Sequence, residues 1–371
     1  MPPIHAVRID RKKPLVEESH TGHNRWHPDI SPVLKVGPGD QVVLETRDAL
    51  DGLITPDSTS AAIKQLDLEK AHPLTGPVFV TGAHPGDTLE VKILDITSES
   101  FGYTLLLPGS GLLKDYFPDP FLVKWEIQDD FATSVQLPGV RIRGNPFMGV
   151  IGVAPSRALL ELSTAREGQL ADLGMKVPLP SANSAVPGTR LVANEGIRTI
   201  PPRENGGNLD IKQLTKGTTL FLPVFTEGAL LSAGDAHFAQ GDSECCGTGV
   251  EIGATLTVQF NIRKGDGLAS SKRGIEFECR DTSDFTNRPR RYHATVGIST
   301  TDEGRHEPGN LNLAARNATL YMIDFLVARY GFSREQAYIL TSVAVDLRIS
   351  EVVNFPNVVV SAFLPLDIFT S

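Results

Sequence analysis

One turn-and-strand pattern recurs along the first part of the chain. A Pro-Gly-Asp turn at 38–40 leads into Gln-Val-Val-Leu-Glu, and another at 85–87 leads into Thr-Leu-Glu-Val-Lys-Ile-Leu. A looser third case leads from Thr-Lys-Gly at 215–217 into Thr-Thr-Leu-Phe. Turns followed by such runs are typical of β-strands. No fixed period separates the copies, so the pattern predicts sheets and not a solenoid.

The C-terminal part changes character. Between residues 311 and 330, apolar side chains recur in steps of seven, three and four, with charged residues between them, which predicts an amphipathic helix. Gly331 ends this helix. Ser333, followed three residues later by Gln336, has the pattern of a capping box and predicts a second helix that runs to about Val345.

No clean domain boundary is visible, so we expect a single domain over 1–371. Residues 1–263 are predicted to be mostly β, and the polar, turn-rich segment 264–308 is predicted to be an excursion or lid. The segment 309–371 holds the helix pair and closing strands, which we expect at the valine runs 352–353 and 358–360. The fold class is therefore α+β, predominantly β, with a sandwich- or barrel-like core and a C-terminal helix pair.

Charge and cysteine usage limit the partners and the location. The net charge of −9 argues against nucleic acid or an anionic membrane as a partner, because both attract basic surfaces. No apolar stretch approaches the roughly 20 residues of a membrane span. Three cysteines in a long chain do not form a disulfide framework. We therefore expect a cytoplasmic protein.

The stretch 204–251 concentrates side chains that suit a metal ion or a charged transition state. Asp235 and His237 are two residues apart, so on a strand they would face the same side, and Asn208 and Asp210 have the same spacing. Two such pairs on neighbouring strands would hold one divalent ion, with Zn²⁺ as the expected metal. The alternative is that Asp235 and Asn208 are ordinary turn residues beside glycines.

Segments spread over nearly the whole chain resemble those of one known family and follow its order. They include His-Pro-Leu-Thr-Gly-Pro at 72–77 and Ser-Val-Ala-Val-Asp-Leu-Arg-Ile at 342–349, together with 23–29, 45–49, 146–155 and 204–244. The chain resembles the acetamidase/formamidase family, and its longer formamidase branch most closely. The resemblance implies hydrolysis of a small carboxamide to a carboxylate and ammonia, by a β-rich protein that assembles into homo-oligomers.

The chain also departs from the family pattern. Ser243 stands where family members usually carry glycine, and Cys245 stands where a branched aliphatic residue is usual. The shorter acetamidase branch lacks the equivalent of Cys246, which argues against a thiol as the universal nucleophile of the family. The family also includes enzymes that open cyclic amides, so the resemblance does not fix the size of the substrate.

Amide hydrolysis requires an activated nucleophile, stabilisation of the oxyanion and a proton for the leaving nitrogen. We expect His237 to act as a metal ligand and catalytic residue, with Asp210 and Asp235 as further ligands. Glu244 is the predicted general base, although it could instead face solvent. Asp48 is predicted to be another ligand or to orient His237.

Three further residues are expected to contact the substrate. Thr75 belongs to the predicted pocket wall, Asn208 lies beside the predicted ligands, and Cys246 follows Glu244 closely. A thiol mechanism through Cys246 remains an alternative to metal-activated water. A serine triad is disfavoured because Gly109-Ser110-Gly111 lacks the spacing of a nucleophile elbow.

Two other functions remain open. A γ-lactam hydrolase could use the same site with a wider pocket. A non-catalytic, β-rich binding protein is the alternative of a different class, but the acidic residues and the histidine of the central cluster are all present, which argues against it.

Overall fold

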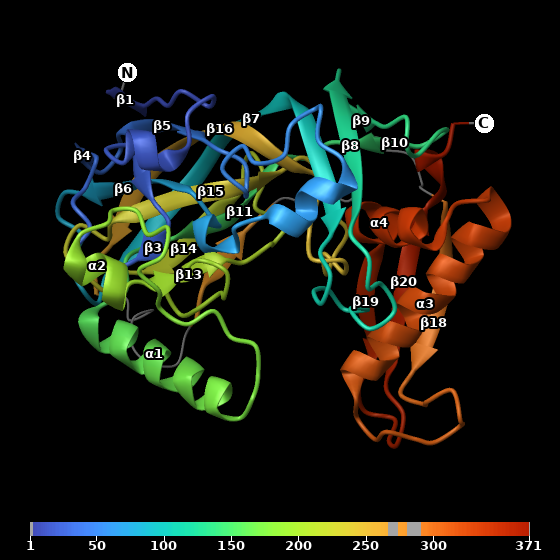
Figure 1. The fold of residues 1–371 in the computed structure, drawn as a ribbon. Coiled ribbons are helices and arrows are strands. Elements are labelled where there is room, and N and C mark those ends of the chain that lie inside the picture. The colour runs from blue at the N-terminus through green and yellow to red at the C-terminus, as the bar shows by residue number, and fades with distance from the viewer. Residues whose placement is uncertain (1–2, 266–273, 280–290, 371) are drawn as a thin grey trace.

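The computed structural model describes residues 3–265, 274–279 and 291–370 (Figure 1). Within these residues, 15 strands form one branched sheet. Its main path runs, in spatial order, through β10 (Arg141–Arg143), β9 (Phe131–Thr133), β8 (Phe121–Gln128), β7 (Thr88–Leu106), β16 (Glu251–Arg263), β15 (Leu231–His237), β11 (Phe147–Gly152) and β13 (Gly206–Asn208).

The remaining strands of this sheet branch from the main path. They are β1 (Ile4–Val7), β2 (Gly22–His23), β4 (Leu34–Val36), β5 (Gln41–Thr46), β6 (Leu74–Val80), β14 (Thr219–Pro223) and β17 (Glu276–Glu278). β3 (Arg25–Trp26) and β12 (Ile197–Arg198) form a separate two-stranded pair.

The sheet forks along one edge of β16. Residues Glu251 and Ile252 pair with the end of β15, and the following residues of the same strand pair with β5. The other edge of β16 pairs with β7 along nearly its whole length. β15 therefore leads into a layer with β6, β11 and β13, while β5 leads into a layer with β1. This forked sheet agrees with the predicted sandwich-like, predominantly β core.

The turn signals at the start of the chain predicted strands correctly. β5, β7 and β14 all begin where the sequence pattern places them. In β5 the alternation has its expected consequence, because Val42 and Leu44 are fully buried while their neighbours are partly exposed. β7 continues well beyond the predicted run because it pairs first with β14 and β16 and then with β8.

The C-terminal helix pair is confirmed, with its caps. α3 (Leu311–Tyr330) ends at Gly331, whose φ of 74° lies in the left-handed region that glycine adopts readily. α4 (Arg334–Ala344) begins with the predicted capping box, in which the side chains of Ser333 and Gln336 each accept from the other's backbone N–H.

A small sheet packs against α3, with β20 (Val359–Pro365) between β18 (Tyr292–Ile298) and β19 (Asp346–Glu351). The run 358–360 overlaps β20, but the strand predicted at 352–353 is wrong. Val352 and Val353 lie exposed in the connection between β19 and β20, and the strand before them starts directly after α4. Apolar character alone was therefore a poor guide at this turn.

The described parts of the polar segment 264–308 contain two strands, β17 and β18. β17 pairs with β14, and β18 pairs with β20 and contacts α3. The same segment has a basic cluster in its sequence, Arg-Pro-Arg-Arg at 288–291. This cluster lies mostly outside the described residues, which resume at Arg291.

The first part of the chain also contains helices that the turn-rich sequence did not predict. The longest is α1, where Ser156 accepts a hydrogen bond from the backbone N–H of Leu159 and so caps the helix. The helices of this part and a last one near the C-terminus are α1 (Arg157–Asp172), α2 (Arg190–Glu195), η1 (Leu15–Glu18), η2 (Ser60–Gln65), η3 (Leu68–Lys70) and η4 (Leu366–Ile368).

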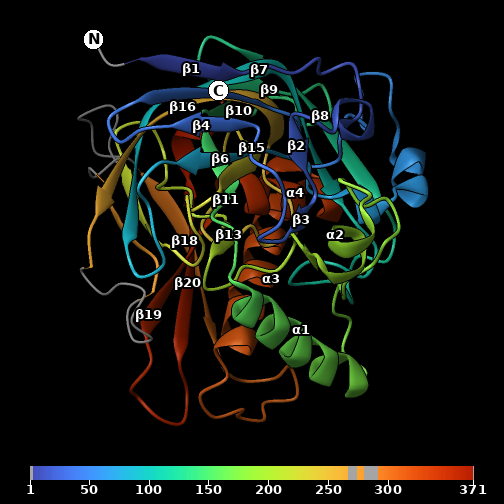
Figure 2. The same ribbon diagram turned by 90° about the vertical axis from the view of Figure 1, so that its left-hand side faces the viewer.

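One buried apolar cluster joins the forked sheet to the C-terminal helices. It extends from Val7 of β1 to Ile368 and includes Leu326 of α3 and Leu340 of α4. Figure 1 shows the C-terminal elements beside the β8 side of the sheet, and Figures 1 and 2 both show β1 and α1 on opposite sides of the molecule. In the described ranges, no helix has the length and apolar character needed to cross a membrane.

Candidate active site

Charged side chains gather at the fork of the sheet. Asp235 and His237 both lie on β15, the condition under which their spacing predicted a shared face, and His237 lies directly opposite Glu251, the first residue of β16. The backbone of Asp235 is unusual for a strand, with a φ of 53°. Phe147 of β11 packs edge-on against the His237 ring at a centroid distance of 5.1 Å. Two sheet layers thus meet around one buried imidazole.

Two groups of possible metal ligands share His237. The first comprises Asp235, His237 and Glu251, and all three are buried. Nε2 of His237 lies 3.1 Å from Oε2 of Glu251 and 3.5 Å from Oδ1 of Asp235. His72, which precedes β6, approaches the other oxygen of Asp235, with 4.0 Å between Nε2 and Oδ2.

The second group comprises Asp210, His237 and Glu244. Oδ1 of Asp210 lies 4.0 Å from Nδ1 of His237, and one ligand atom of each of the three residues lies within 4.8 Å of the others. Asp210 follows β13, and Glu244 lies in the turn after β15. Burial raises the pKa of Glu244, and because these two carboxyl groups lie close together, the charge of Asp210 raises that pKa further.

Gly149 of β11 makes room for the carboxylates. A Cβ at this position would lie 2.6 Å from Oδ1 of Asp210 and 2.8 Å from both the backbone oxygen and Oδ2 of Asp235. Its own carbonyl accepts from the backbone N–H groups of Leu209 and Asp210. Gly149 therefore sets how closely both groups of ligands approach the sheet.

Burial and the neighbouring charges favour the charged form of some ionisable groups of the site and the neutral form of others. Burial alone would lower the pKa of His237, but Glu251 and Asp235 raise that pKa well above its usual value. Burial would raise the pKa of Asp235, but His72 and His237 hold it below its usual value. His237 and Asp235 thus form the ionised pair at the centre of the site.

The other carboxyl groups are shifted the opposite way. Burial raises the pKa of Asp210 to about 7 and that of Glu251 to about 8. Burial and the adjacent Asp210 raise the pKa of Glu244 well above its usual value. The site thus contains more buried carboxyl groups than its histidines can neutralise, and a bound cation would relieve this imbalance.

Unpartnered polar atoms point to the same conclusion. Among the described residues, Oδ1 of Asp210 is buried without a hydrogen bond, and Oε2 of Glu251 is buried with the His237 imidazole 3.1 Å away. Buried polar atoms in proteins are nearly always satisfied, so the buried oxygen of Asp210 fits a site that holds a cation. Carboxylate oxygens with a nearby imidazole are a suitable donor set for Zn²⁺ or a similar divalent ion.

Asp48 is separate from these groups, although the sequence suggested it as a ligand. Its carboxylate accepts hydrogen bonds from the backbone N–H groups of Leu50 and Gly52 and, at 2.8 Å, from the hydroxyl of Tyr103. Neither group of possible ligands in the described chain includes it. Its oxygens are used to hold the loop after β5 and the side chain of Tyr103.

The three expected substrate contacts differ in their surroundings. Thr75 lies on β6, and its hydroxyl donates to the carbonyl of Glu45 at 2.7 Å. Asn208 ends β13, and its buried Oδ1 has no hydrogen-bond partner in the described part of the chain, so it is available to a ligand. Nε1 of Trp26 is likewise buried and unpartnered there, and lies 3.5 Å from where a Cβ on Gly207, the residue before Asn208, would sit.

Cys246 is packed in the core. Its backbone N–H donates to the hydroxyl of Ser342 on α4, and its thiol lies 3.7 Å from the carbonyl of Leu105. Burial raises the pKa of the Cys246 thiol to about 11. A thiol with so high a pKa is a poor nucleophile near neutral pH, which disfavours the thiol mechanism.

Sequence reasoning overlooked Glu251, His72 and Gln240. Glu251 opens an apolar strand and His72 precedes a Pro-Leu run, so neither belongs to a cluster of polar residues in the sequence that would mark it as a site residue. Only the pairing of β15 with β16 brings Glu251 opposite His237. Glu204, the first acidic residue of the stretch 204–251, lies at the surface away from these groups and pairs with Arg166 at 2.5 Å.

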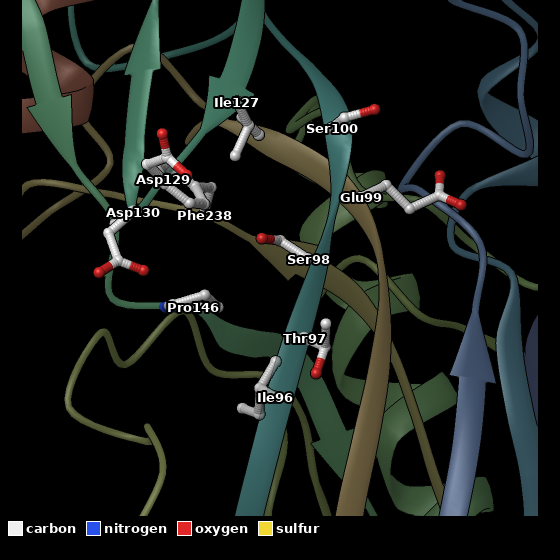
Figure 3. A pocket seen from close by; sticks show the side chains of 11 residues that line it. Ile96, Thr97, Ser98, Glu99, Ser100, Ile127, Asp129, Asp130, Pro146 and Phe238 are labelled. Carbon is white, nitrogen blue, oxygen red and sulfur yellow. The ribbon is translucent and has the colours of Figure 1, made fainter.

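A polar cavity of about 340 Å³ lies beside the fork (Figure 3). Phe238, the residue after His237, lines it together with Glu99, Asp129 and Asp130. The described lining residues include no member of either group of possible ligands. This cavity is therefore distinct from the cluster around His237.

Comparison with known proteins identifies the family. A family model described as "Acetamidase/Formamidase family" matches residues 8–371. The chain belongs to the acetamidase/formamidase family. It is 36% identical to a formamidase of Methylophilus methylotrophus, with 98% of this chain and 93% of the relative covered. It is also 36% identical to an acetamidase of Mycolicibacterium smegmatis, with 92% and 89% covered.

A solved structure extends this likeness to three dimensions. A γ-lactamase from Delftia acidovorans superimposes with a TM-score of 0.92 at 34% identity, and the match covers 99% of this chain and 94% of that one. The acetamidase/formamidase chain described here thus shares its whole fold with a protein named for the opening of a cyclic amide.

Proposed function

We propose that this protein hydrolyses a small carboxamide, of the size of formamide, to a carboxylate and ammonia. It is an amidohydrolase acting on carbon–nitrogen bonds outside peptides, as its membership of the acetamidase/formamidase family indicates. The observation that carries the site assignment is the convergence of four carboxyl groups on the buried His237, with a buried oxygen of Asp210 that makes no hydrogen bond.

We propose a divalent cation, most simply Zn²⁺, as the cofactor of this site. The two candidate ligand groups share His237, which is joined by Asp235 and Glu251 in one and by Asp210 and Glu244 in the other. Asp210, Asp235 and His237 were expected as ligands from the sequence. The charge imbalance and the buried oxygen of Asp210 without a hydrogen bond support this proposal. When bound, such an ion activates water and polarises the amide carbonyl.

The side chains of this chain supply the proton transfers. The close approach of Glu244 and Asp210 would let these two carboxyl groups share one proton. Once ionised, Glu244 accepts a proton from the attacking water and later gives it to the leaving nitrogen. The nitrogen then leaves as ammonia and not as an amide anion. The raised pKa of Glu244 makes its carboxylate, once ionised, a stronger base toward the attacking water.

The carboxamide itself would be held by polar atoms beside β13. Its NH₂ group can donate to the buried Oδ1 of Asn208, which has no hydrogen-bond partner among the described residues. Thr75 is expected to contribute pocket shape, because its hydroxyl proton is already used by Glu45. Cys246 is expected to support the site through packing and not to act as a nucleophile.

A γ-lactam is the second candidate substrate. The likeness to the Delftia acidovorans γ-lactamase over the whole chain favours it. A lactam presents the same carbonyl and nitrogen to the site but needs additional space for its ring. We also propose a cytoplasmic location and a homo-oligomeric state. Exposed apolar side chains such as Val353 and Phe355 are consistent with assembly.

The decisive assay measures ammonia release from formamide, acetamide and propionamide, and ring opening of a γ-lactam in parallel. Each is measured as purified, after dialysis against a strong chelator, and after addition of Zn²⁺. We expect turnover of a small linear amide that falls on chelation and returns with metal. Turnover of none of these substrates would refute the function, and unchanged turnover in metal-free protein would refute the cofactor.

A further inference from the structure

Gln240 makes two hydrogen bonds that tie the two groups of ligands together. Its Oε1 lies 2.7 Å from Nδ1 of His237, and its Nε2 donates to the backbone carbonyl of Asp210 at 2.9 Å. One side chain therefore contacts the shared imidazole and the loop that carries Asp210.

These two bonds determine which ring nitrogen keeps its hydrogen when the imidazole of His237 is neutral. A backbone carbonyl can only accept a hydrogen bond, so the amide nitrogen of Gln240 must face Asp210. The amide oxygen then faces His237, and an amide oxygen can only accept. Nδ1 of His237 must therefore carry a hydrogen, and only Nε2 is left to offer a lone pair.

The backbone around Gln240 is fixed in place. Phe238 donates to the carbonyl of Val250, and Gly241 donates to that of Ser342 on α4. Gly241 also lies so close to Val345 that a Cβ there would come within 2.1 Å of the Val345 oxygen. The Gln240 side chain therefore starts from a rigid point between β15 and α4, as a positioning residue requires.

We propose that Gln240 is a positioning residue that makes His237 a ligand through Nε2, and so assigns the ion to Asp235, His237 and Glu251. This inference rests on the proposed metal site. Nε2 faces Glu251 and Asp235 at 3.1 and 3.5 Å, whereas Nδ1, which faces Asp210, is occupied by the bond to Gln240. Asp210 and Glu244 are then left free to hold and transfer the proton.

The test combines ¹⁵N NMR of the imidazole with Zn²⁺ binding measured by competition with a chromophoric chelator. In the wild type, Nδ1 of His237 should carry a proton, whether Zn²⁺ is present or not. Gln240→Met removes both hydrogen bonds at similar size, and we expect the dissociation constant for Zn²⁺ to rise about 10–100-fold. Gln240→Glu keeps an acceptor for Nδ1–H and should retain the protonated Nδ1.

Gln136→Met is the matched control. Gln136 also bridges two backbone groups, accepting from Lys124 and donating to Leu122, but it lies in the β8–β9 region. This variant should lose a comparable pair of hydrogen bonds and leave Zn²⁺ affinity and the His237 signals unchanged.

Three results would overturn the proposal. One is a wild-type spectrum with an unprotonated Nδ1, and another is a folded Gln240→Met protein with wild-type Zn²⁺ affinity. If the wild type binds no Zn²⁺ at all, the proposed cofactor fails and the assignment of the ion fails with it. In that case the ¹⁵N spectrum at a pH above the pKa of His237, where the imidazole is neutral, still decides separately whether Gln240 fixes the proton on Nδ1.

Discussion

Replacement of Gly149 by alanine should damage the site from within the sheet. The backbone at this glycine does not lie in the left-handed region, so only the space around its Cβ matters. Contacts of 2.6 Å to Oδ1 of Asp210 and 2.8 Å to the backbone oxygen of Asp235 are far shorter than real Cβ contacts. The side chain of Asp210 can move away, but the Asp235 carbonyl belongs to β15 and cannot move without disturbing the sheet.

The expected size of the effect follows from this geometry. Inserting a methyl group into a packed site typically costs about 1–3 kcal/mol. Gly149→Ala should therefore lower the free energy of unfolding by about that amount, measured by urea denaturation of the metal-free protein. Because the same displacement moves Asp210 and Asp235, Zn²⁺ affinity and amide turnover should fall together.

Gly168→Ala is the matched control for this experiment. Gly168 lies within α1, and a Cβ there would meet nothing within 4 Å. Alanine at this position should stabilise the protein by about 0.5–1 kcal/mol through helix propensity and leave the activity unchanged. If Gly149→Ala behaved like Gly168→Ala in stability and Zn²⁺ binding, the argument that glycine makes room for the carboxylates would be refuted.

Three further predictions follow from individual side chains. Glu244→Gln should keep the metal and lose about 10²–10⁴-fold in turnover, while Glu204→Gln at the surface should keep both; near-normal turnover of the first would exclude Glu244 as the base. Cys246→Ala should retain amide turnover after correction for any loss of stability, and abolished turnover in a folded, metal-loaded variant would revive the thiol mechanism. Burial lowers the pKa of His23 from 6.5 to about 4, so below pH 6.5 the unfolded chain binds a proton that the folded protein does not. The free energy of unfolding should therefore fall by up to about 3 kcal/mol between pH 6.5 and 4, and His23→Gln should reduce this slope in pH-dependent urea denaturation; an identical slope in the variant would contradict it.

Local signals were enough for the elements whose ends are set by neighbouring residues. The capping box at Ser333 and the glycine at 331 fix the limits of α3 and α4 through contacts within one helical turn. The Pro-Gly-Asp turns locate β5 and β7 in the same way. Val352 and Val353 lacked such a signal, and their β-propensity alone gave a strand where the chain turns.

The site depends on contacts between distant residues, which a single sequence does not contain. Asp235 and His237 could be found by their spacing, because strand geometry places them near each other. Glu251 becomes a neighbour of His237 only through the register of β15 with β16. Asp48 shows the reverse error, since its acidity suggested a ligand but Tyr103 and two backbone N–H groups use its oxygens.

Anomalous diffraction from crystals soaked in Zn²⁺ tests the central claim most directly, when amide turnover is measured on the same preparation. The account predicts one strong peak about 2.0–2.2 Å from Nε2 of His237 and from carboxylate oxygens of Asp235 and Glu251, and turnover that rises with its occupancy. An empty map at this position in crystals of protein that hydrolyses the amide at full rate would contradict it.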